Sequence, residues 1–112
     1  MTDKTGLTLL LDYYGSFLTS RQREIMQMSV DEDMSLSEIA EEIGVSRQGV
    51  RDCLSKASRL LEEMEDRLGL VEKDRTLRAV SEKLRSAALT GENEKLLTAA
   101  LAAADDIDSL VR

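Results

Sequence analysis

The sequence predicts an all-α protein built around a helix-turn-helix, and three observations support this fold class. The 112 residues contain no proline, and good helix formers such as leucine, alanine, glutamate and arginine dominate. The alternation of apolar and polar residues that marks half-buried strands is missing. Capping residues recur ahead of apolar positions spaced three and four apart. We expect a helical domain over residues 1–71 and a C-terminal helical hairpin over residues 72–112.

The first third of the chain predicts two helices. Residues 7–14 form the first helix, and Gly15 ends it. A capping box is indicated by the spacing of Thr19-Ser20-Arg21-Gln22. In such a box the first hydroxyl accepts from a free backbone amide, and the side chain three positions on bonds to the amide of the first residue. This box opens a second helix, which runs to about Val30 and ends at the acidic residues 31–33. The inward positions of the second helix are Ile25 and Met28.

The three aromatic residues of the chain lie close together, at Tyr13, Tyr14 and Phe17. We expect this cluster to anchor the core of the N-terminal domain. A platform on which nucleic-acid bases stack is the alternative role for the same side chains.

Residues 36–53 have the features of a helix-turn-helix. Ser35-Leu36-Ser37-Glu38 is a second capping box, and it opens a short helix that ends at about Ile43. Gly44 suits the left-handed conformation that ends a helix, and Ser46 caps a long helix reaching about Leu68. Such a motif places its second helix in the major groove of DNA. The expected core positions are Ile39, Ala40, Ile43, Val50 and Cys53, with Val45 filling the turn. An ordinary helical hairpin within a bundle is the alternative.

The outward face of the long helix carries the candidate nucleic-acid contacts. Residues 46–59 hold four positive charges and one negative charge. Arg47 and Arg51 lie one turn apart, where each guanidinium suits a guanine edge, and Gln48 suits adenine. The predicted base-reading residues are Arg47, Gln48, Arg51 and Ser55, and the predicted phosphate-binding residues are Ser46, Lys56 and Arg59. The alternative is that these arginines only solvate an exposed helix face.

Apolar residues continue beyond the helix-turn-helix in a pattern that predicts self-association. From Val50 to Val71 they recur with a mean spacing of 3.5, more than one small motif can cover. Two further stripes, over 77–87 and 97–111, predict a helical hairpin that packs on the domain or on a partner. We therefore expect a homodimer. The apolar positions of the last stripe are Leu97, Ala100, Leu101, Ala104, Ile107 and Val111.

Composition excludes several classes of protein. The chain has no histidine and one cysteine, so it lacks an imidazole-based catalytic triad, His-ligated zinc and an internal disulfide. We expect a non-enzymatic protein of the reducing cytoplasm, without a metal or cofactor. The apolar run from Leu96 to Ala104 is too short to cross a bilayer. With 22 acidic and 15 basic residues the formal charge is −7, which predicts poor non-specific affinity for DNA.

Five segments of the chain resemble the YlxM family, small bacterial proteins similar to region 4 of sigma-70 factors. These segments are Leu9-Leu10-Leu11-Asp12-Tyr13-Tyr14, Leu18-Thr19-Ser20-Arg21-Gln22-Arg23, Leu36-Ser37-Glu38-Ile39-Ala40-Glu41-Glu42, Val45-Ser46-Arg47-Gln48 and residues 60–70. The resemblance covers about residues 7–73. It implies that residues 46–48 read DNA. The chain departs from the family pattern at Gly49, where alanine is usual, and at Arg51, where an aromatic residue is expected.

The resemblance also implies a function and a set of partners. It implies a DNA-binding regulatory protein that takes part in the signal recognition particle pathway, with DNA or the particle's RNA as its ligand. The alternative is a protein-interaction accessory of the particle's GTPase or its receptor, in which the helix-turn-helix is only a scaffold. The acidic balance favours the accessory, whereas the outward arginines favour the nucleic-acid ligand.

Overall fold

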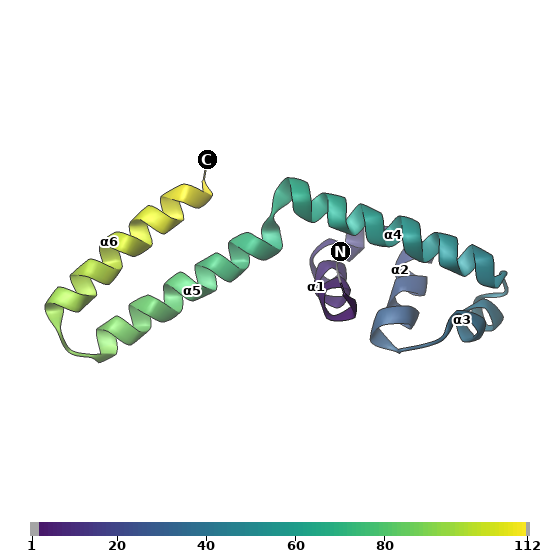
Figure 1. Cartoon of the computed structure of the whole chain (residues 1–112), viewed down its shortest axis with the longest axis horizontal. Helices are drawn as coiled ribbons and strands as arrows, with labels where there is room; N and C mark the ends of the chain where they lie inside the picture. Colours follow the sequence, from purple (N-terminus) through teal and green to yellow (C-terminus); the bar gives the residue numbers. More distant parts are fainter. Residues whose placement is uncertain (1–2, 112) are drawn as a thin grey trace. The chain divides into compact units, whose positions relative to one another are not determined.

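The computed structural model describes residues 3–111, and this range is helical with no strand (Figure 1). The all-α prediction is therefore confirmed. The chain forms two compact units that divide between Gly69 and Leu70. The first unit contains α1 (Lys4–Tyr14), η1 (Gly15–Phe17), α2 (Ser20–Met26), η2 (Gln27–Asp31), α3 (Leu36–Ile43) and α4 (Arg47–Leu68). The second unit contains α5 (Leu70–Leu89) and α6 (Asn93–Leu110).

Side-chain caps fix the starts of the helices in the first unit. The expected capping boxes at Thr19 and Ser35 are both complete. In each box the hydroxyl accepts from the backbone amide of the residue three positions on, and the side chain of that residue accepts from the amide of the capping residue. The first helix begins at Lys4, three residues before the predicted Leu7, because the carboxylate of Asp3 accepts from the amide of Gly6 at 2.8 Å. A short polar residue at this position satisfies an otherwise free amide and extends the helix.

The second helix does not keep α geometry as far as Val30. After Met26 the chain turns into the π-helix η2, and the amide of Glu32 donates to the carbonyl of Gln27 at 3.1 Å. The wider π turn changes which side chains face inward. Ile25 and Met26 are fully buried, whereas the expected inward residue Met28 is half-buried.

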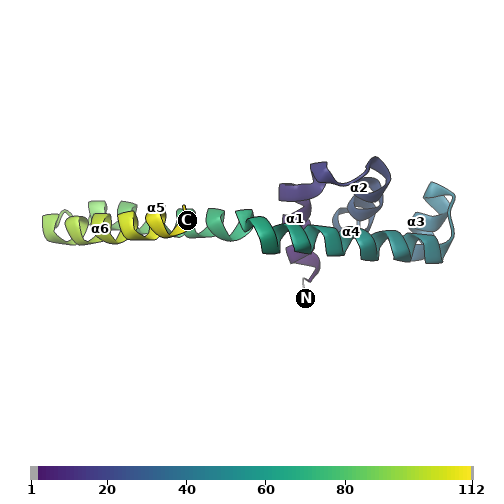
Figure 2. The same ribbon diagram turned by 90° about the horizontal axis from the view of Figure 1, so that it is seen from above.

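The core of the first unit lies between α4 and the three helices that precede it. Figure 1 shows α1, α2 and α3 on one side of α4, and Figure 2 shows α2 and α3 beside it from above. The buried cluster under the helix-turn-helix joins α2, α3 and α4. Its buried members are Ile25, Ile39, Ala40 and Val50, with Ile43, Cys53 and Leu54 among the residues packed against it.

Two of the expected core residues lie at the surface. Val45 was predicted to fill the turn, but its side chain is 38% exposed. The backbone closes this turn instead, since the amides of Gly44 and Val45 both donate to the carbonyl of Ala40, at 2.9 and 3.1 Å. In the aromatic cluster only Tyr14 is fully buried, and Phe17, at the end of η1, is 64% exposed.

The second unit is a helical hairpin in which α5 and α6 pack side by side (Figure 1). Gly91 forms the turn with a φ of 73°, in the left-handed region that favours glycine. Val80 on α5 and Ala103 on α6 are buried. The predicted stripe over 97–111 does not face α5, since Leu97, Leu101 and Val111 are 64%, 71% and 77% exposed. Small side chains such as Ala99 and Ala103 take the positions that face α5.

Candidate nucleic-acid interface

The turn between α3 and α4 positions the first residues of the candidate recognition helix. Gly44 adopts a left-handed conformation with a φ of 82°, which ends α3 and redirects the chain. Two residues later the hydroxyl oxygen of Ser46 accepts from the amide of Gly49 at 2.9 Å and starts α4. The buried side chain of Val50 then fixes the rotation of α4 on the core. Local capping and one buried anchor therefore determine which face of α4 meets solvent.

All four predicted base-reading residues lie on the exposed surface of α4. Arg47, Gln48, Arg51 and Ser55 are exposed, and their spacing of three and four residues places them on adjoining faces of one helix. Within residues 3–111 neither arginine forms an ion pair with a carboxylate. Both guanidinium groups are consequently available to an external acceptor.

Gln48 is oriented by a neighbour on the same helix. Its Nε2 donates to Oδ1 of Asp52 at 2.9 Å. An amide nitrogen has two hydrogens, so the second hydrogen and the carbonyl oxygen stay available for a bidentate contact with an adenine edge. Asp52 thereby holds the amide plane of Gln48 in one orientation.

Gly49 has a local structural explanation. A Cβ atom added at this position would lie 3.1 Å from the hydroxyl oxygen of Ser46. The glycine therefore leaves room for the hydroxyl that caps α4. This explains why glycine, a residue that weakens helices, occurs in the first turn of α4. The capping hydroxyl of Ser46 still has its own hydrogen to donate to a phosphate oxygen.

The predicted phosphate-binding residues continue along α4, and the structure adds a residue that sequence reasoning missed. Lys56 and Arg59 are exposed on α4. Arg21 on α2 lies close enough to Cys53 for its charge to act on the thiol. Burial raises the pKa of Cys53, and the positive charges of Arg21 and Lys56 partly offset that rise. The position of Arg21 in the first turn of α2 predicts exposure, but its proximity to α4 depends on how the two helices pack.

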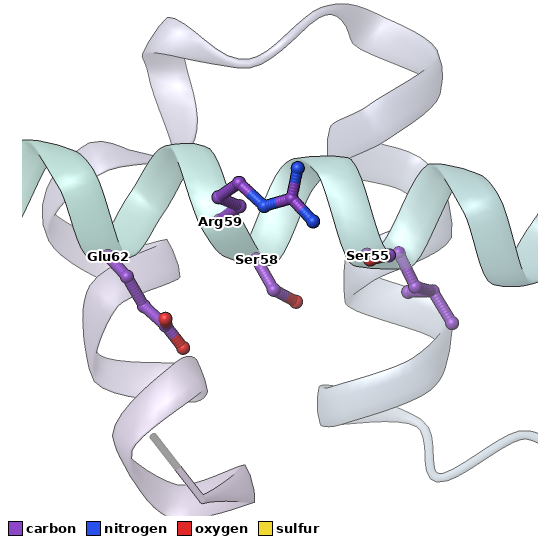
Figure 3. A pocket seen from close by; sticks show the side chains of 5 residues that line it. Ser55, Ser58, Arg59 and Glu62 are labelled. Atoms are coloured by element: carbon purple, nitrogen blue, oxygen red, sulfur yellow. The ribbon is translucent and has the colours of Figure 1, made fainter. Parts of the chain in front are cut away.

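An open groove of about 380 Å³ lies along α4 and brings two predicted roles together (Figure 3). Figure 3 shows Ser58 and Glu62 projecting to the same side of α4, with the Arg59 side chain extending along the helix. Ser55, predicted to contact bases, lines the same groove as Arg59, predicted to contact phosphate. Two hydroxyls and one guanidinium suit a phosphate group, whereas the carboxylate of Glu62 opposes an anion at the far end. The groove is lined by Leu54, Ser55, Ser58, Arg59 and Glu62.

Acidic residues limit the positive surface to the first half of α4. The next turns carry carboxylates within residues 62–66, and Glu41 and Glu42 are exposed on α3. Among residues 3–111 no cluster of three carboxylate or thiol side chains is placed to hold a metal ion. In the same range no helix is long and apolar enough to cross a membrane.

The fold and this surface define the chain as a helix-turn-helix protein whose second helix is basic in its first half. Residues 1–100 match the family model of UPF0122, described as "Putative helix-turn-helix protein, YlxM / p13 like". The chain belongs to this family, which confirms the resemblance to YlxM proteins.

Individual relatives cover most of the chain. It is 36% identical over 104 residues to the UPF0122 protein YlxM of Bacillus subtilis, which covers 93% of this chain and 94% of that protein. It is 47% identical over 79 residues to a UPF0122 protein of Caldanaerobacter subterraneus subsp. tengcongensis, covering 70% and 68%. A UPF0122 protein of Shouchella clausii is 44% identical over 88 residues, covering 78% and 81%. The family description names a helix-turn-helix protein and no enzymatic activity.

Proposed function

We propose that this protein is a non-enzymatic, cytoplasmic regulator that binds duplex DNA through the first half of α4. One observation carries the proposal. Arg47 and Arg51 are exposed one turn apart at the start of the second helix of a helix-turn-helix, and neither forms an ion pair within residues 3–111. The N-terminal turns of this helix are the part that meets base edges in the major groove.

The roles divide along the helix. Arg47 and Arg51 each grip a guanine edge, and Gln48, held by Asp52, reads adenine. Ser55 completes the base-contacting set. Phosphate oxygens are bound by Ser46, Lys56 and Arg59, which fix the protein on the duplex without reading sequence.

Selection from random duplexes, followed by titration of the selected sequence, tests this proposal. Replacing Arg47 or Arg51 by alanine should weaken specific binding by roughly 1–3 kcal/mol, because each bidentate contact to a base is worth that much. Arg67→Ala is the matched control, since Arg67 is exposed on the last turn of the same helix, outside the basic half. Selection that enriches no sequence, or equal losses in all three variants, would contradict the base-reading roles.

The resemblance to YlxM proteins extends the proposal to the signal recognition particle pathway. In that pathway the ligand is DNA or the particle's RNA, and both are polyanions that the basic half of α4 can meet. The same titration with the particle's RNA in place of the duplex separates the two ligands. The ligand that loses affinity in the Arg47→Ala and Arg51→Ala variants is the one that α4 recognises.

A second candidate function follows from the acidic surfaces. The formal charge is −7, and the carboxylates gather on the second half of α4 and on α6. Such surfaces repel nucleic acid and suit a basic protein partner. In this alternative the protein is an accessory of the particle's GTPase or its receptor, and the helix-turn-helix is a scaffold. Binding to either protein, retained in the Arg47→Ala and Arg51→Ala variants without any binding to nucleic acid, would favour it. In both functions we propose that the protein acts as a homodimer.

A further inference from the structure

The hairpin formed by α5 and α6 has one polar face and one apolar face. A shallow pocket marks the polar face, and its lining includes Lys83, Glu92, Lys95 and Thr98. Large apolar side chains are exposed elsewhere on both helices. Their spacing of three or four residues along each helix places several of them together on the other face of the hairpin. The apolar face consists of Leu77, Leu84 and Ala88 from α5, Leu97, Ala100, Ala104 and Ile107 from α6, and Val111 directly after α6.

This apolar face is too exposed to be the surface of an independent unit. Leu97 and Val111 are 64% and 77% exposed, and Leu77 is 44% exposed. Between the two helices only Val80 and Ala103 are well buried, because small alanine side chains bring the helices close together. Two helices alone cannot bury a core of useful size, and helices of this length commonly complete one as a four-helix bundle.

We infer that the apolar face of the hairpin binds the same face of a second copy of this chain, so that the two hairpins form a four-helix bundle. In this bundle α5 of one copy packs against α6 of its partner. The two alanines on α6, at 100 and 104, allow close approach. Leu77 and Leu97 of each copy fill the space between the layers.

Charge complementarity selects this partner and this pairing. Along α5 there are five basic and three acidic side chains, whereas α6 has four acidic side chains and one basic. Pairing α5 with α6 of the second copy brings opposite net charges together. The other twofold arrangement, with α5 on α5 and α6 on α6, would oppose like charges and is disfavoured.

The acidic balance of α6 disfavours anionic partners for this face. Asp108 borders the face beside Ile107, and α6 has four acidic side chains in all. They would repel anionic lipid headgroups and the phosphates of nucleic acid. This inference rests on the homodimer proposed above and gives it an interface, and it depends on the hairpin and not on the role of α4.

Sedimentation equilibrium of the full chain, without nucleic acid, tests the inference. The unmodified protein should be a dimer at about 10 µM, and Leu97→Glu should raise the dimer dissociation constant roughly 30-fold or more, as expected when a charge replaces a large apolar side chain buried in an interface. Thr98→Glu is the matched control, because Thr98 lies on the polar face of the same turn and should leave the dimer intact. Circular dichroism should show unchanged helix content, since Leu97 is already exposed within one copy.

A second variant gives an independent measurement. Ile107 lies toward the other end of the same face and is 41% exposed, so Ile107→Glu should also weaken the dimer while the helix content is preserved. Two results would overturn the inference. One is a monomeric unmodified protein at about 100 µM. The other is a dimer that Leu97→Glu and Ile107→Glu both leave unchanged while the helix content is preserved.

Discussion

The phenol of Tyr14 donates a hydrogen bond of 2.6 Å to Oε1 of Glu65, and this bond joins the end of α1 to the later turns of α4. The Tyr14 ring is fully buried, so the hydroxyl reaches the surface of α4 from inside the core. At its other end α4 is anchored by Val50 in the cluster under the helix-turn-helix. The recognition helix is therefore fixed at two widely separated points.

Removing the Tyr14 hydroxyl should measure how much its hydrogen bond to Glu65 contributes to stability. Tyr14→Phe keeps the buried ring but loses the bond to a carboxylate, and we expect the free energy of unfolding to fall by about 1–2 kcal/mol. Chemical denaturation of the full chain measures the change. Glu63→Gln is the control, since Glu63 is exposed two residues from Glu65 and should have almost no effect. Equal losses in the two variants would show that the bond contributes nothing specific.

The capping boxes at Ser35 and Thr19 should respond differently to acid. Hydrogen bonding to Ser35, mainly to its backbone amide, lowers the pKa of Glu38 below its ordinary value of 4.5. The contribution of this box to stability is therefore complete above that value, and it is lost as the pH falls through the lowered pKa. The box at Thr19 uses Gln22, which does not titrate, so it should hold at all these pH values.

Thermal unfolding between about pH 6 and pH 3 tests this difference. Glu38→Gln should keep the capping bonds and flatten the acid-side loss of melting temperature relative to the unmodified protein. Glu41→Gln is the matched control, because Glu41 is exposed on the same helix but outside the box. If both variants follow the unmodified curve, Glu38 does not contribute to acid sensitivity.

Two apolar residues of the helix-turn-helix should differ sharply in their effect on stability. Ile39 is fully buried, so Ile39→Ala should destabilise the first unit by about 3 kcal/mol through lost burial and a cavity. Val45 is 38% exposed, and Val45→Ala should change the free energy of unfolding by about 0.5 kcal/mol or less. Denaturation of the two variants side by side decides the point. A large loss at Val45 would restore the role that the sequence first predicted for it.

Sequence reasoning succeeded where the chemistry is local. A capping box joins residues three apart, so Ser35 and Glu38 predict the start of α3 without knowledge of the fold. The same holds for Gly44, whose left-handed conformation ends α3. Asp3 caps α1 in the same way, so the earlier start of that helix was open to the same reasoning.

Sequence reasoning failed where packing decides. Hydrophobicity predicted a buried Val45, but backbone bonds to Ala40 close that turn and leave the side chain at the surface. On α6 apolar residues occupy several faces, so spacing alone does not reveal that Ala103 faces α5 while Leu97 and Leu101 face outward. Arg21 escaped notice because its proximity to the basic half of α4 depends on the contact between two helices.

The position of Arg21 leads to a prediction about salt dependence. If Arg21, Lys56 and Arg59 contact phosphates, each releases counterions on binding, and the slope of log affinity against log salt reflects their number. Replacing any one of them by alanine should reduce that slope by about 0.9 and weaken all sequences alike. Arg47→Ala should instead reduce the preference for the selected sequence over random duplex, because it removes a contact to a base edge.

Titrations at several salt concentrations, with selected and random duplexes, separate the two kinds of contact. Arg67→Ala should change neither the slope nor the preference, since it lies at the far end of α4 among carboxylates. If Arg21→Ala leaves the slope of log affinity against log salt unchanged, the phosphate contacts are made by α4 and not by Arg21. If Arg21→Ala changes the slope as much as Lys56→Ala does, then α2 and α4 both contact the phosphate backbone of the nucleic acid.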